Sequence, residues 1–392
     1  MSKFKNVYQG IFSIKNNNDR KVITFLGIKL KLKNKKYYAE TKEAIKIQDD
    51  YNLLKLINAE KIILFFIPYK FKMCGGIMSI FSLCEYSRHI NNDSFCLIAT
   101  YPGKLTYAKN EEFNNSEQIY RWEQIVKNAK NVKELMIHIP EYYAKDFYSD
   151  LSKDEIKFLK SIESLHINIM NQNIELMPKP ENLKELYKLT SNITQTIAHD
   201  RYATQEICNK WQMPTHLFSV HIDCSKYKSY EFDKKEKIIV LSPDENENKS
   251  TIVDKLKREL PDFKLITVES MRFGDYMDLI ARAYFTITFG EGMDGYFSQP
   301  CYVNSLGFAV YNDKFFPDSS WMELKNVYSS YEEMVFNIIS DMECLSKNEI
   351  DYTNAIIKTK EKHSKLYQLD QFENNLKKFY EYNYDFYPQK KV

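Results

Sequence analysis

Strand-like segments rich in apolar residues alternate with amphipathic stretches along most of the chain. Strands are predicted at 93–100, 133–140 and 164–171, and the first of the series, 61–68 (KIILFFIP), is a continuous apolar run. Runs of this kind are typical of parallel strands that are buried on both faces. Apolar residues at helical spacing occupy the stretches 38–57, 77–88, 117–130 and 142–162. Strands that alternate with helices predict βαβ units and a parallel sheet.

The alternation pauses over 182–223, where we expect two helical pieces, and the polar segment 226–236 is expected to be a linker or surface loop. It then restarts. Further strands are predicted at 237–244, 263–269, 284–289 and 308–312, and helices at 248–260, 274–283 and much of 331–386. The pattern therefore predicts an α/β fold of two tandem Rossmann-like domains. The expected division is a basic N-terminal hairpin (1–37), a first domain (38–223), a second domain (237–340) and a helical C-terminal tail packed back across both (341–392).

Charge is concentrated at the N-terminus. The chain has 392 residues and a net charge of only +2, but residues 1–37 hold ten Lys or Arg and one acid, Asp19. One interpretation is an edge hairpin whose lysines prevent aggregation. Another is a patch that contacts an anionic membrane surface. Nucleic acid is the least favoured of these interpretations, because the rest of the chain is acidic and would oppose its binding.

The remaining composition excludes several classes. Seven cysteines, an odd number without a CxxC pair, indicate neither a disulfide framework nor a zinc site. The N-terminus lacks a signal peptide's apolar core, and no apolar stretch is long enough to span a membrane. We therefore expect a cytoplasmic protein, with peripheral attachment to the inner membrane as an option.

Glycine is scarce, with ten residues in the chain, well below the ~7 % of average usage. Two clusters follow predicted strands, where parallel sheets bind ligands. Gly75 and Gly76 open the helix after the first strand, where free N–H groups favour a phosphate or sugar oxygen. The run Gly290-Glu291-Gly292-Met293-Asp294-Gly295 interleaves glycines with acids that can hold sugar or ribose hydroxyls.

The stretch 276–311 (YMDLIARAYFTITFGEGMDGYFSQPCYVNSLGFAVY) resembles the donor-binding end of GT-B glycosyltransferases. The Gly75–Gly76 loop is similar to the glycine-rich loop near the N-terminus of those families, and the likeness covers the architecture of about residues 60–340. The element KVITFLGIKLKLK resembles a lead-in of lipooligosaccharide and capsule glycosyltransferases from Campylobacter-like bacteria.

The resemblance implies a donor site in the second domain. Glu291 matches the first acid of the family's paired-glutamate motif, which contacts the donor sugar. The chain departs from the motif at the second acid, where Gln299 stands, or Tyr302 or Val303 in another register. Basic residues near the diphosphate are also sparse: Ser242 stands where a cation is expected, which leaves Lys249, Arg272 and Arg201 as candidates.

Histidines with neighbouring carboxylates are the candidates for a catalytic base. His199 and Asp200 form one such pair, and His138 and Glu141, at the end of a predicted strand, form the other. His216 and His221 are expected to be structural, because both fall in or beside a predicted strand.

The resemblance implies a glycosyltransferase, hexosyl or related, that moves a sugar from a nucleotide-sugar to a glycan or glycolipid acceptor of the lipooligosaccharide or capsule type. No Asp-x-Asp motif occurs, so we expect no metal and no resident cofactor. Two alternatives stay open: a non-catalytic subunit that binds a nucleotide-sugar, and a transferase of another, phospho-type group onto capsule sugars.

Overall fold

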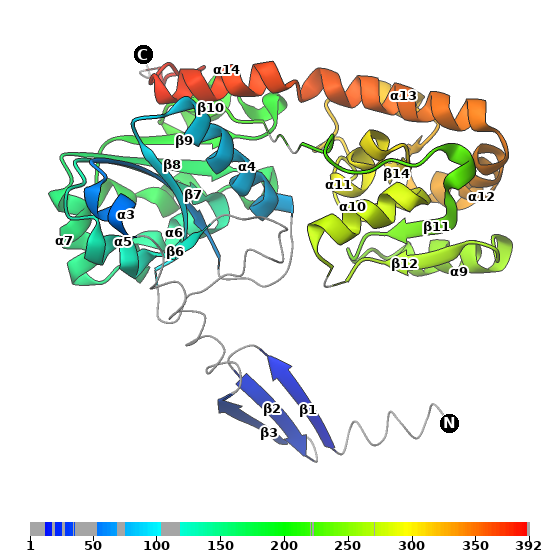
Figure 1. The fold of residues 1–392 in the computed structure, drawn as a ribbon, viewed down its shortest axis with the longest axis horizontal. Coiled ribbons are helices and arrows are strands. Elements are labelled where there is room, and N and C mark those ends of the chain that lie inside the picture. The colour runs from blue at the N-terminus through cyan, green and yellow to red at the C-terminus, as the bar shows by residue number, and fades with distance from the viewer. Residues whose placement is uncertain are drawn as a thin grey trace.

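The computed structural model describes residues 12–17, 20–25, 28–33, 35, 53–68, 75–102, 118–219, 221, 223–269 and 271–389. Two sheets, each covered by helices, form two α/β domains that lie side by side (Figure 1). The predicted fold class, two Rossmann-like domains followed by a helical C-terminus, is confirmed.

The first domain is built on a seven-stranded sheet whose neighbouring strands are all parallel. In sheet order its strands are β10 (Thr215–Leu217), β9 (Ile193–Ile197), β8 (Ser164–Asn171), β7 (Glu134–Pro140), β4 (Lys61–Ile67), β5 (Phe95–Thr100) and β6 (Ile119–Arg121). Its helices are α3 (Leu54–Asn58), α4 (Gly75–Ile90), α5 (Trp122–Asn128), α6 (Glu141–Asp150), α7 (Lys153–Ser161) and α8 (Gln205–Trp211). Short 3₁₀ turns occupy η2 (Ile174–Leu176), η3 (Pro180–Leu183), η4 (Leu186–Lys188) and η5 (Asp200–Tyr202).

The second domain has a five-stranded sheet, also parallel throughout. In sheet order its strands are β12 (Lys264–Thr267), β11 (Glu236–Leu241), β13 (Ala283–Ile287), β14 (Leu306–Val310) and β15 (Val327–Tyr328). Its helices and 3₁₀ turns are η6 (Phe232–Lys234), α9 (Lys249–Glu259), α10 (Phe273–Arg282), α11 (Gly295–Ser298), η7 (Pro300–Val303), η8 (Ser319–Glu323) and α12 (Tyr331–Lys347).

Alternate residues of the central strands enter different cores. In β4, Ile62, Leu64 and Phe66 pack in one hydrophobic cluster, while Ile63, Phe65 and Ile67 pack in another on the opposite face. The residues of β11 divide in the same way, with Ile239 and Leu241 on one face and Ile238 and Val240 on the other. Burial on both faces explains why these strands are continuous apolar runs in the sequence.

The structure corrects several predicted elements. The N-terminal segment contains three antiparallel strands, β1 (Phe12–Asn17), β2 (Arg20–Phe25) and β3 (Ile28–Lys33), where a two-stranded hairpin was expected. Of the helix predicted at 38–57, residues 38–52 lie outside the described residues. The helix predicted at 142–162 is divided, because Ser152 caps a new helix by accepting a hydrogen bond from the Glu155 backbone N–H at 3.3 Å.

The pause at 182–223 contains two strands: β10, where a strand was expected beside His216, and β9, which was not predicted. Strand β9 buries Thr194, Gln195 and Thr196, polar residues that a hydrophobic pattern does not reveal. Their side chains bond to neighbouring strands: Thr194 to His166 at 2.8 Å and Gln195 to Thr215 at 2.9 Å. A polar core strand is stable when its groups are satisfied in this way.

His138 belongs to this buried polar layer, which corrects its predicted place in the cleft. The side chain is fully buried, its ring stacks on Phe65 with centroids 4.3 Å apart, and its Nδ1 lies 3.0 Å from the Asn168 amide nitrogen. Burial, and next the neighbouring His166, hold the pKa of His138 well below its ordinary value. The imidazole is thus a core group and does not line the cavity described below.

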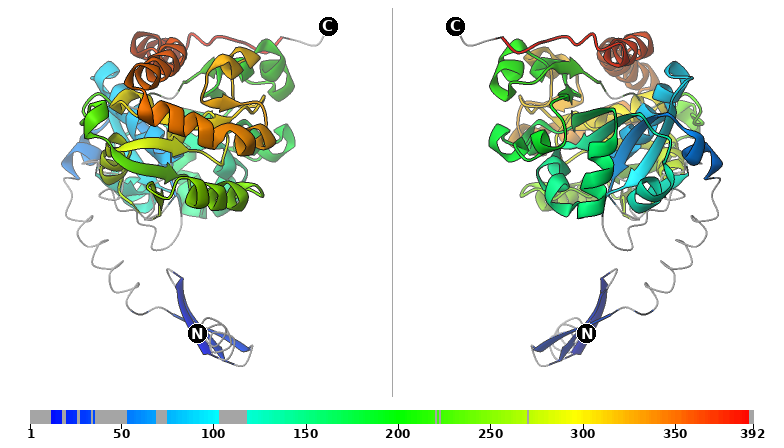
Figure 2. Two further views of the ribbon diagram at one scale, coloured as in Figure 1. Left: turned by 90° about the vertical axis from the view of Figure 1, so that its right-hand side faces the viewer. Right: turned by 90° about the vertical axis from the view of Figure 1, so that its left-hand side faces the viewer.

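The C-terminal tail connects the two domains. Helix α13 (Glu349–Leu366) packs on the second domain, and α14 (Leu369–Tyr380) continues across to the first, along the same side of the molecule (Figures 1 and 2). Phe372, Leu376 and Phe379 of α14, at helical spacing, enter the core beside α4. The apolar face of α14 thus attaches the tail to the first domain.

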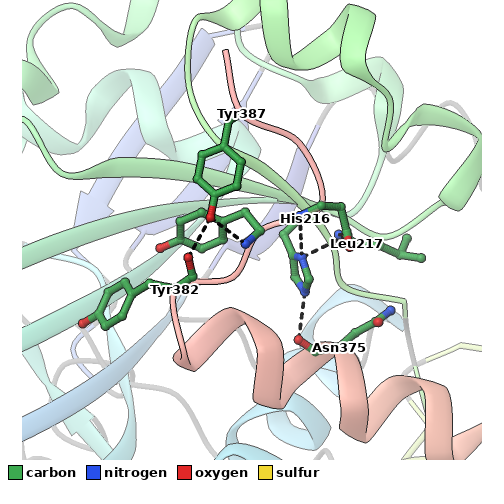
Figure 3. Close-up of polar contacts among 7 residues, drawn as sticks. His216, Leu217, Asn375, Tyr382 and Tyr387 are labelled. Carbon is green, nitrogen blue, oxygen red and sulfur yellow. Dashed lines mark hydrogen bonds and ion pairs between the residues drawn. The ribbon is translucent and has the colours of Figure 1, made fainter. Parts of the chain in front are cut away.

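His216 of β10 fastens the end of the tail, in agreement with its expected structural role (Figure 3). Its Nε2 lies 2.8 Å from the Asn375 carbonyl oxygen, and its Nδ1 lies 2.9 Å from the Asp385 carboxylate. Phe386 forms an antiparallel bridge with Thr215.

Within the described part of the chain, no helix is both long and apolar enough to cross a membrane.

Candidate functional site

A cavity of about 730 Å³ lies between the two domains, at the ends of strands β8, β9 and β13. The first domain contributes the start of α4, Gln172 and His199, and the second contributes the loop after β13. The junction of α13 and α14, at His363–Asp370, closes a further side. A smaller space of about 370 Å³ shares Gly75, Gly76, Glu291, Asp294, Gly295 and Gln299 with it. Both predicted glycine clusters therefore face the same cavity, which we call the main cavity.

The N-terminus of α4 forms the wall on the first domain's side. A Cβ at Gly75 would meet no heavy atom within 4 Å, whereas one at Gly76 would approach the Gln172 side-chain oxygen to 3.0 Å. Gly75 thus presents bare backbone to the cavity. Unpaired N–H groups at the start of a long helix, together with the helix dipole, favour an anionic ligand group there.

The loop after β13 forms the opposite wall, and its glycines are needed for its shape. Gly292 has φ +87°, and a Cβ there would lie 2.7 Å from both the Phe316 ring and the Val310 carbonyl oxygen. A Cβ at Gly290 would lie 3.0 Å from a carboxylate oxygen of Asp244. Gly295 is the first residue of α11. Only glycine fits at position 292, because its positive φ is unfavourable for other residues and a Cβ would clash with its neighbours.

Asp294 has a structural task within this loop. Its Oδ1 accepts hydrogen bonds from the backbone N–H groups of Tyr296 at 2.9 Å and Phe297 at 3.2 Å, which makes it the N-cap of α11. Its Oδ2 accepts a hydrogen bond from the Thr288 hydroxyl. Burial raises the pKa of Asp294 to about 6, against these hydrogen bonds, which lower it. The carboxyl is thus committed to holding the loop.

Glu291 points across the gap between the domains. Its carboxylate accepts a hydrogen bond from the side-chain amide of Asn173, in the loop after β8, at 2.6 Å. Burial raises the pKa of Glu291 to about 7, and the nearby carboxylates of Asp294, Asp244, Glu175 and Glu141 add to the shift. A carboxyl that titrates near neutral pH is suited to exchange a proton or a hydrogen bond with a ligand hydroxyl.

Glu141 lies behind Asn173. Its side chain is 2 % exposed, accepts a hydrogen bond from the Asn173 backbone N–H at 3.1 Å, and does not line the main cavity. Burial raises the pKa of Glu141. The residue therefore supports the Asn173 loop, and neither Glu141 nor His138, both expected in the cleft, lines the main cavity.

His199, one of the predicted candidates for the base, lines the main cavity. Burial lowers the pKa of His199, while the charge of Asp200 and a hydrogen bond to the Gln172 backbone raise it. A neutral imidazole at a cavity wall is able to accept a proton from a hydroxyl. The Asp200 carboxylate instead accepts a hydrogen bond from the Arg201 backbone N–H at 2.6 Å, within its own turn.

The predicted cations do not gather at the main cavity. Lys249 donates to the carbonyl oxygens of Ser242 and Asp244, each at 2.8 Å, and thereby caps the end of β11. Arg272 is exposed at the start of α10 and lines neither space. Among the described residues that line the main cavity there is no Lys or Arg, while Asp223, Glu291, Asp294 and Asp370 contribute carboxylates.

Arg201 lies elsewhere, in a small neighbouring pocket of about 140 Å³. The guanidinium donates to the carbonyl oxygens of Asp313 and Phe316, which belong to the second domain. Tyr202 donates to the Lys314 carbonyl oxygen at 2.8 Å, and the Lys314 ammonium pairs with Glu175 at 2.6 Å. These contacts join the loops after β8 and β9 to the second domain.

Several lining residues escaped the sequence analysis. Gln172, Asn173 and Glu175 follow the apolar run of β8, so the rule that ligands bind at the carboxyl ends of parallel strands would have indicated them. His363, Tyr367 and Gln368 carried no comparable signal, because they reach the cavity only through the tail's crossing. The part of the chain that the structure describes contains no group of three or more His, Cys, Asp or Glu able to hold a metal ion.

Comparison with known proteins identifies the fold. No protein-family model matches the sequence, and no curated protein matches it either. A glycosyltransferase from Rickettsia africae superposes with a TM-score of 0.51 at 10 % identity, over 83 % of this chain and 98 % of that one. Sucrose-phosphate synthase from Thermosynechococcus elongatus gives 0.49 at 7 % identity, over 82 % and 98 %. A putative UDP-N-acetylglucosamine 2-epimerase from Listeria monocytogenes gives 0.46 at 8 % identity, over 76 % and 91 %. At this identity the first likeness shows the fold alone, a two-domain architecture of GT-B type.

Proposed function

We propose that this chain is a glycosyltransferase that moves a hexosyl or related sugar from a nucleotide-sugar to a surface-glycan acceptor of the lipooligosaccharide or capsule class. The observation that carries the proposal is the main cavity, which has the N-terminus of α4 on one wall and Glu291 on the other. A UDP-, GDP- or dTDP-sugar combines an anionic diphosphate with a sugar polyol, and a CMP-sugar carries a single anionic phosphate at the same place. A helix N-terminus suits the anionic group and a carboxylate suits the polyol.

Each wall has a role in this proposal. The backbone at Gly75 and Gly76 faces the diphosphate, and the Gly290–Gly295 loop with Gln299 surrounds the donor sugar. Glu291 binds a sugar hydroxyl, and its position depends on the cap that Asp294 gives to α11. His199 accepts the proton of the acceptor hydroxyl as the new glycosidic bond forms, which leaves the nucleotide diphosphate as the leaving group.

One observation favours a second candidate, a nucleotide-sugar-binding protein without catalysis. A departing diphosphate needs positive charge, and the described lining of the main cavity supplies no Lys or Arg. Lys249, one of the three predicted donor cations, is occupied by two carbonyl oxygens. Turnover separates the candidates, since a binding protein retains the nucleotide-sugar intact.

The test is release of free nucleotide from UDP-, GDP-, dTDP- and CMP-sugars with an extract of cell-surface glycan as the acceptor source. We expect release with one donor class and its loss in Glu291→Ala, with Glu343→Ala on α12 as the control for a partly exposed glutamate outside the cavity. Binding without release in the wild-type chain supports the second candidate. Equal turnover by Glu291→Ala contradicts the donor role of this carboxylate.

Metal independence is part of the same proposal. The helix N-terminus and the protein's own hydrogen-bond donors neutralise the diphosphate in this account. Nucleotide release should therefore be unchanged by a chelator. Its loss in the chelator, and recovery with a divalent cation, would contradict this part.

Membrane contact is proposed for the N-terminal segment alone. Ten cations within residues 1–37 are attracted to anionic lipid at about 1 kcal/mol each near the surface. We expect the full chain to sediment with vesicles that contain anionic lipid, and a chain lacking residues 1–37 to remain in the supernatant. Equal sedimentation of the two would reject the contact.

A further inference from the structure

A small pocket beside the main cavity has the opposite electrostatic character. It is lined by Arg201, Lys314 and Lys365, with Asp200 as its single carboxylate among the described lining residues. The main cavity has four carboxylates and no Lys or Arg among its own. We call the small space the cationic pocket. An anionic group is favoured there and opposed at the carboxylates of the main cavity.

The two spaces adjoin. His199 and Tyr367 line both of them, so a ligand long enough to occupy both spaces would pass these two side chains. His199 is also the proposed base of the transfer reaction. The hydroxyl that it would deprotonate therefore lies on a ligand whose further part reaches toward the cationic pocket.

The three cations come from parts of the chain that are distant in the sequence and come together at this pocket. Arg201 belongs to the turn after β9, Lys314 to the segment after β14, and Lys365 to the end of α13. Lys365 has no hydrogen bond or ion pair with any described residue of the chain, and Arg201 uses only its Nη1 in its two bonds to carbonyl oxygens. The Lys314 ammonium is paired with Glu175, so the donors that remain for a ligand are those of Lys365 and Arg201. A guanidinium binds a carboxylate or phosphate through two parallel N–H groups.

We infer that the cationic pocket binds a phosphate or carboxylate substituent of the acceptor glycan, and so selects acidic acceptors. The inference rests on the proposed function in one respect, that the bound glycan is the acceptor of the transfer. The anion-binding site itself does not depend on that function. The donor diphosphate is the other possible source of an anion. The diphosphate fits the cationic pocket less well, because neither of the glycine clusters assigned to the donor, Gly75–Gly76 and Gly290–Gly295, lines this pocket.

The probes for a binding test are glucose 6-phosphate, glucuronate, glucose and UDP, titrated calorimetrically into the full chain at low ionic strength. We expect the two acidic sugars to bind more tightly than glucose, and their affinity to fall as salt is added. Lys365→Ala should weaken both acidic sugars about tenfold, the cost of one charge-assisted hydrogen bond. UDP affinity should be unchanged.

Two further variants make the outcome specific. Lys358→Ala, an exposed lysine on the same helix outside the pocket, is the matched control and should leave every affinity unchanged. Arg201→Lys keeps the charge but loses the planar guanidinium, and should also weaken the acidic sugars. Because Arg201 contacts both domains, the folding of the Arg201→Lys variant is checked by circular dichroism. If that variant does not fold, the result for Lys365→Ala still tests the inference.

Three results would overturn the inference. The acidic sugars could bind no better than glucose, Lys365→Ala could leave their affinity unchanged, or that variant could weaken UDP as much as the acidic sugars. The last result would assign the pocket to the donor diphosphate. Failure of UDP to bind, with the acidic sugars behaving as expected, would contradict the proposed nucleotide-sugar donor and leave the anion site intact.

Discussion

The side-chain amide of Asn173 donates a hydrogen bond to the Glu291 carboxylate at 2.6 Å, and this contact joins the two domains at the main cavity. Asn173 follows β8 of the first domain, and Glu291 follows β13 of the second. The residue proposed to bind the donor sugar is therefore positioned by a domain to which it does not belong. A ligand that engages Glu291 competes with this bond or extends it.

Removal of the Asn173 amide should raise the pKa of Glu291 further. A hydrogen bond to a carboxylate stabilises its charged form, so its loss favours protonation. In Asn173→Ala, the carboxyl resonance of Glu291 in a ¹³C NMR titration should move its midpoint to higher pH than in the wild-type chain. Asn354→Ala, an exposed position on α13, is the control. An unchanged or lower midpoint in Asn173→Ala would show that the bond does not stabilise the ionised form.

The raised pKa of Glu291 should appear in the pH dependence of stability. The folded chain holds the proton up to about pH 7, against an ordinary value of 4.5. The resulting stabilisation is fully present below about pH 4.5 and is lost as pH rises through about 7. The glutamine of Glu291→Gln does not ionise, so this variant keeps its stability as the pH rises. The free energy of unfolding of the variant minus that of the wild type should therefore increase by about 1–3 kcal/mol between about pH 4.5 and pH 7. Urea unfolding at several pH values measures it, and a constant difference would contradict the shift.

Substitution of one glycine in each of the two glycine clusters should separate folding from ligand binding. Gly292→Ala places a methyl group 2.7 Å from the Phe316 ring at a φ of +87°. We expect a loss of about 1–3 kcal/mol of unfolding free energy in a urea titration. Gly75→Ala meets nothing within 4 Å, so it should fold normally but weaken UDP binding because its methyl group faces the cavity. Equal stability of Gly292→Ala and wild type would be inconsistent with this loop geometry.

The crossing of the tail should contribute strongly to stability. Phe379 of α14 is fully buried against the first domain, whereas Phe336 of α12 is 81 % exposed. Phe379→Ala should cost about 3–5 kcal/mol of unfolding free energy, and Phe336→Ala little. Differential scanning calorimetry compares the two. A small effect at Phe379 would mean that α14 is not docked as described.

The hydrophobic pattern predicted most of the strands that are buried on both faces, since β4 is a continuous apolar run and β7, β8, β11 and β13 are rich in apolar residues. It missed β9, because Thr194, Gln195 and Thr196 are satisfied only by partners on strands distant in the sequence. For the same reason His138 was interpreted as a cleft residue. Whether a polar side chain after a strand faces a cavity or a polar layer depends on its neighbours in the sheet.

The two glycine loops and Glu291 were predicted to form the site, and the structure places them around one cavity. The tail residues of that cavity were not found, because α13 and α14 show only amphipathic helices in the sequence. The positions of the cations were also missed. Lys249 has a structural role in capping β11, and Arg201 lies in a separate pocket, arrangements set by contacts between the domains.

Binding of a nucleotide-sugar in the cavity between Gly75 and Glu291 is the central claim, and a thermal-shift series with UDP-, GDP-, dTDP- and CMP-sugars tests it most directly. One class should stabilise the wild-type chain by about 2.7 kcal/mol at a concentration of 100 times its Kd. The same donor should stabilise Glu291→Ala markedly less. No shift with any of the four classes, or an equal shift in Glu291→Ala, would contradict the claim.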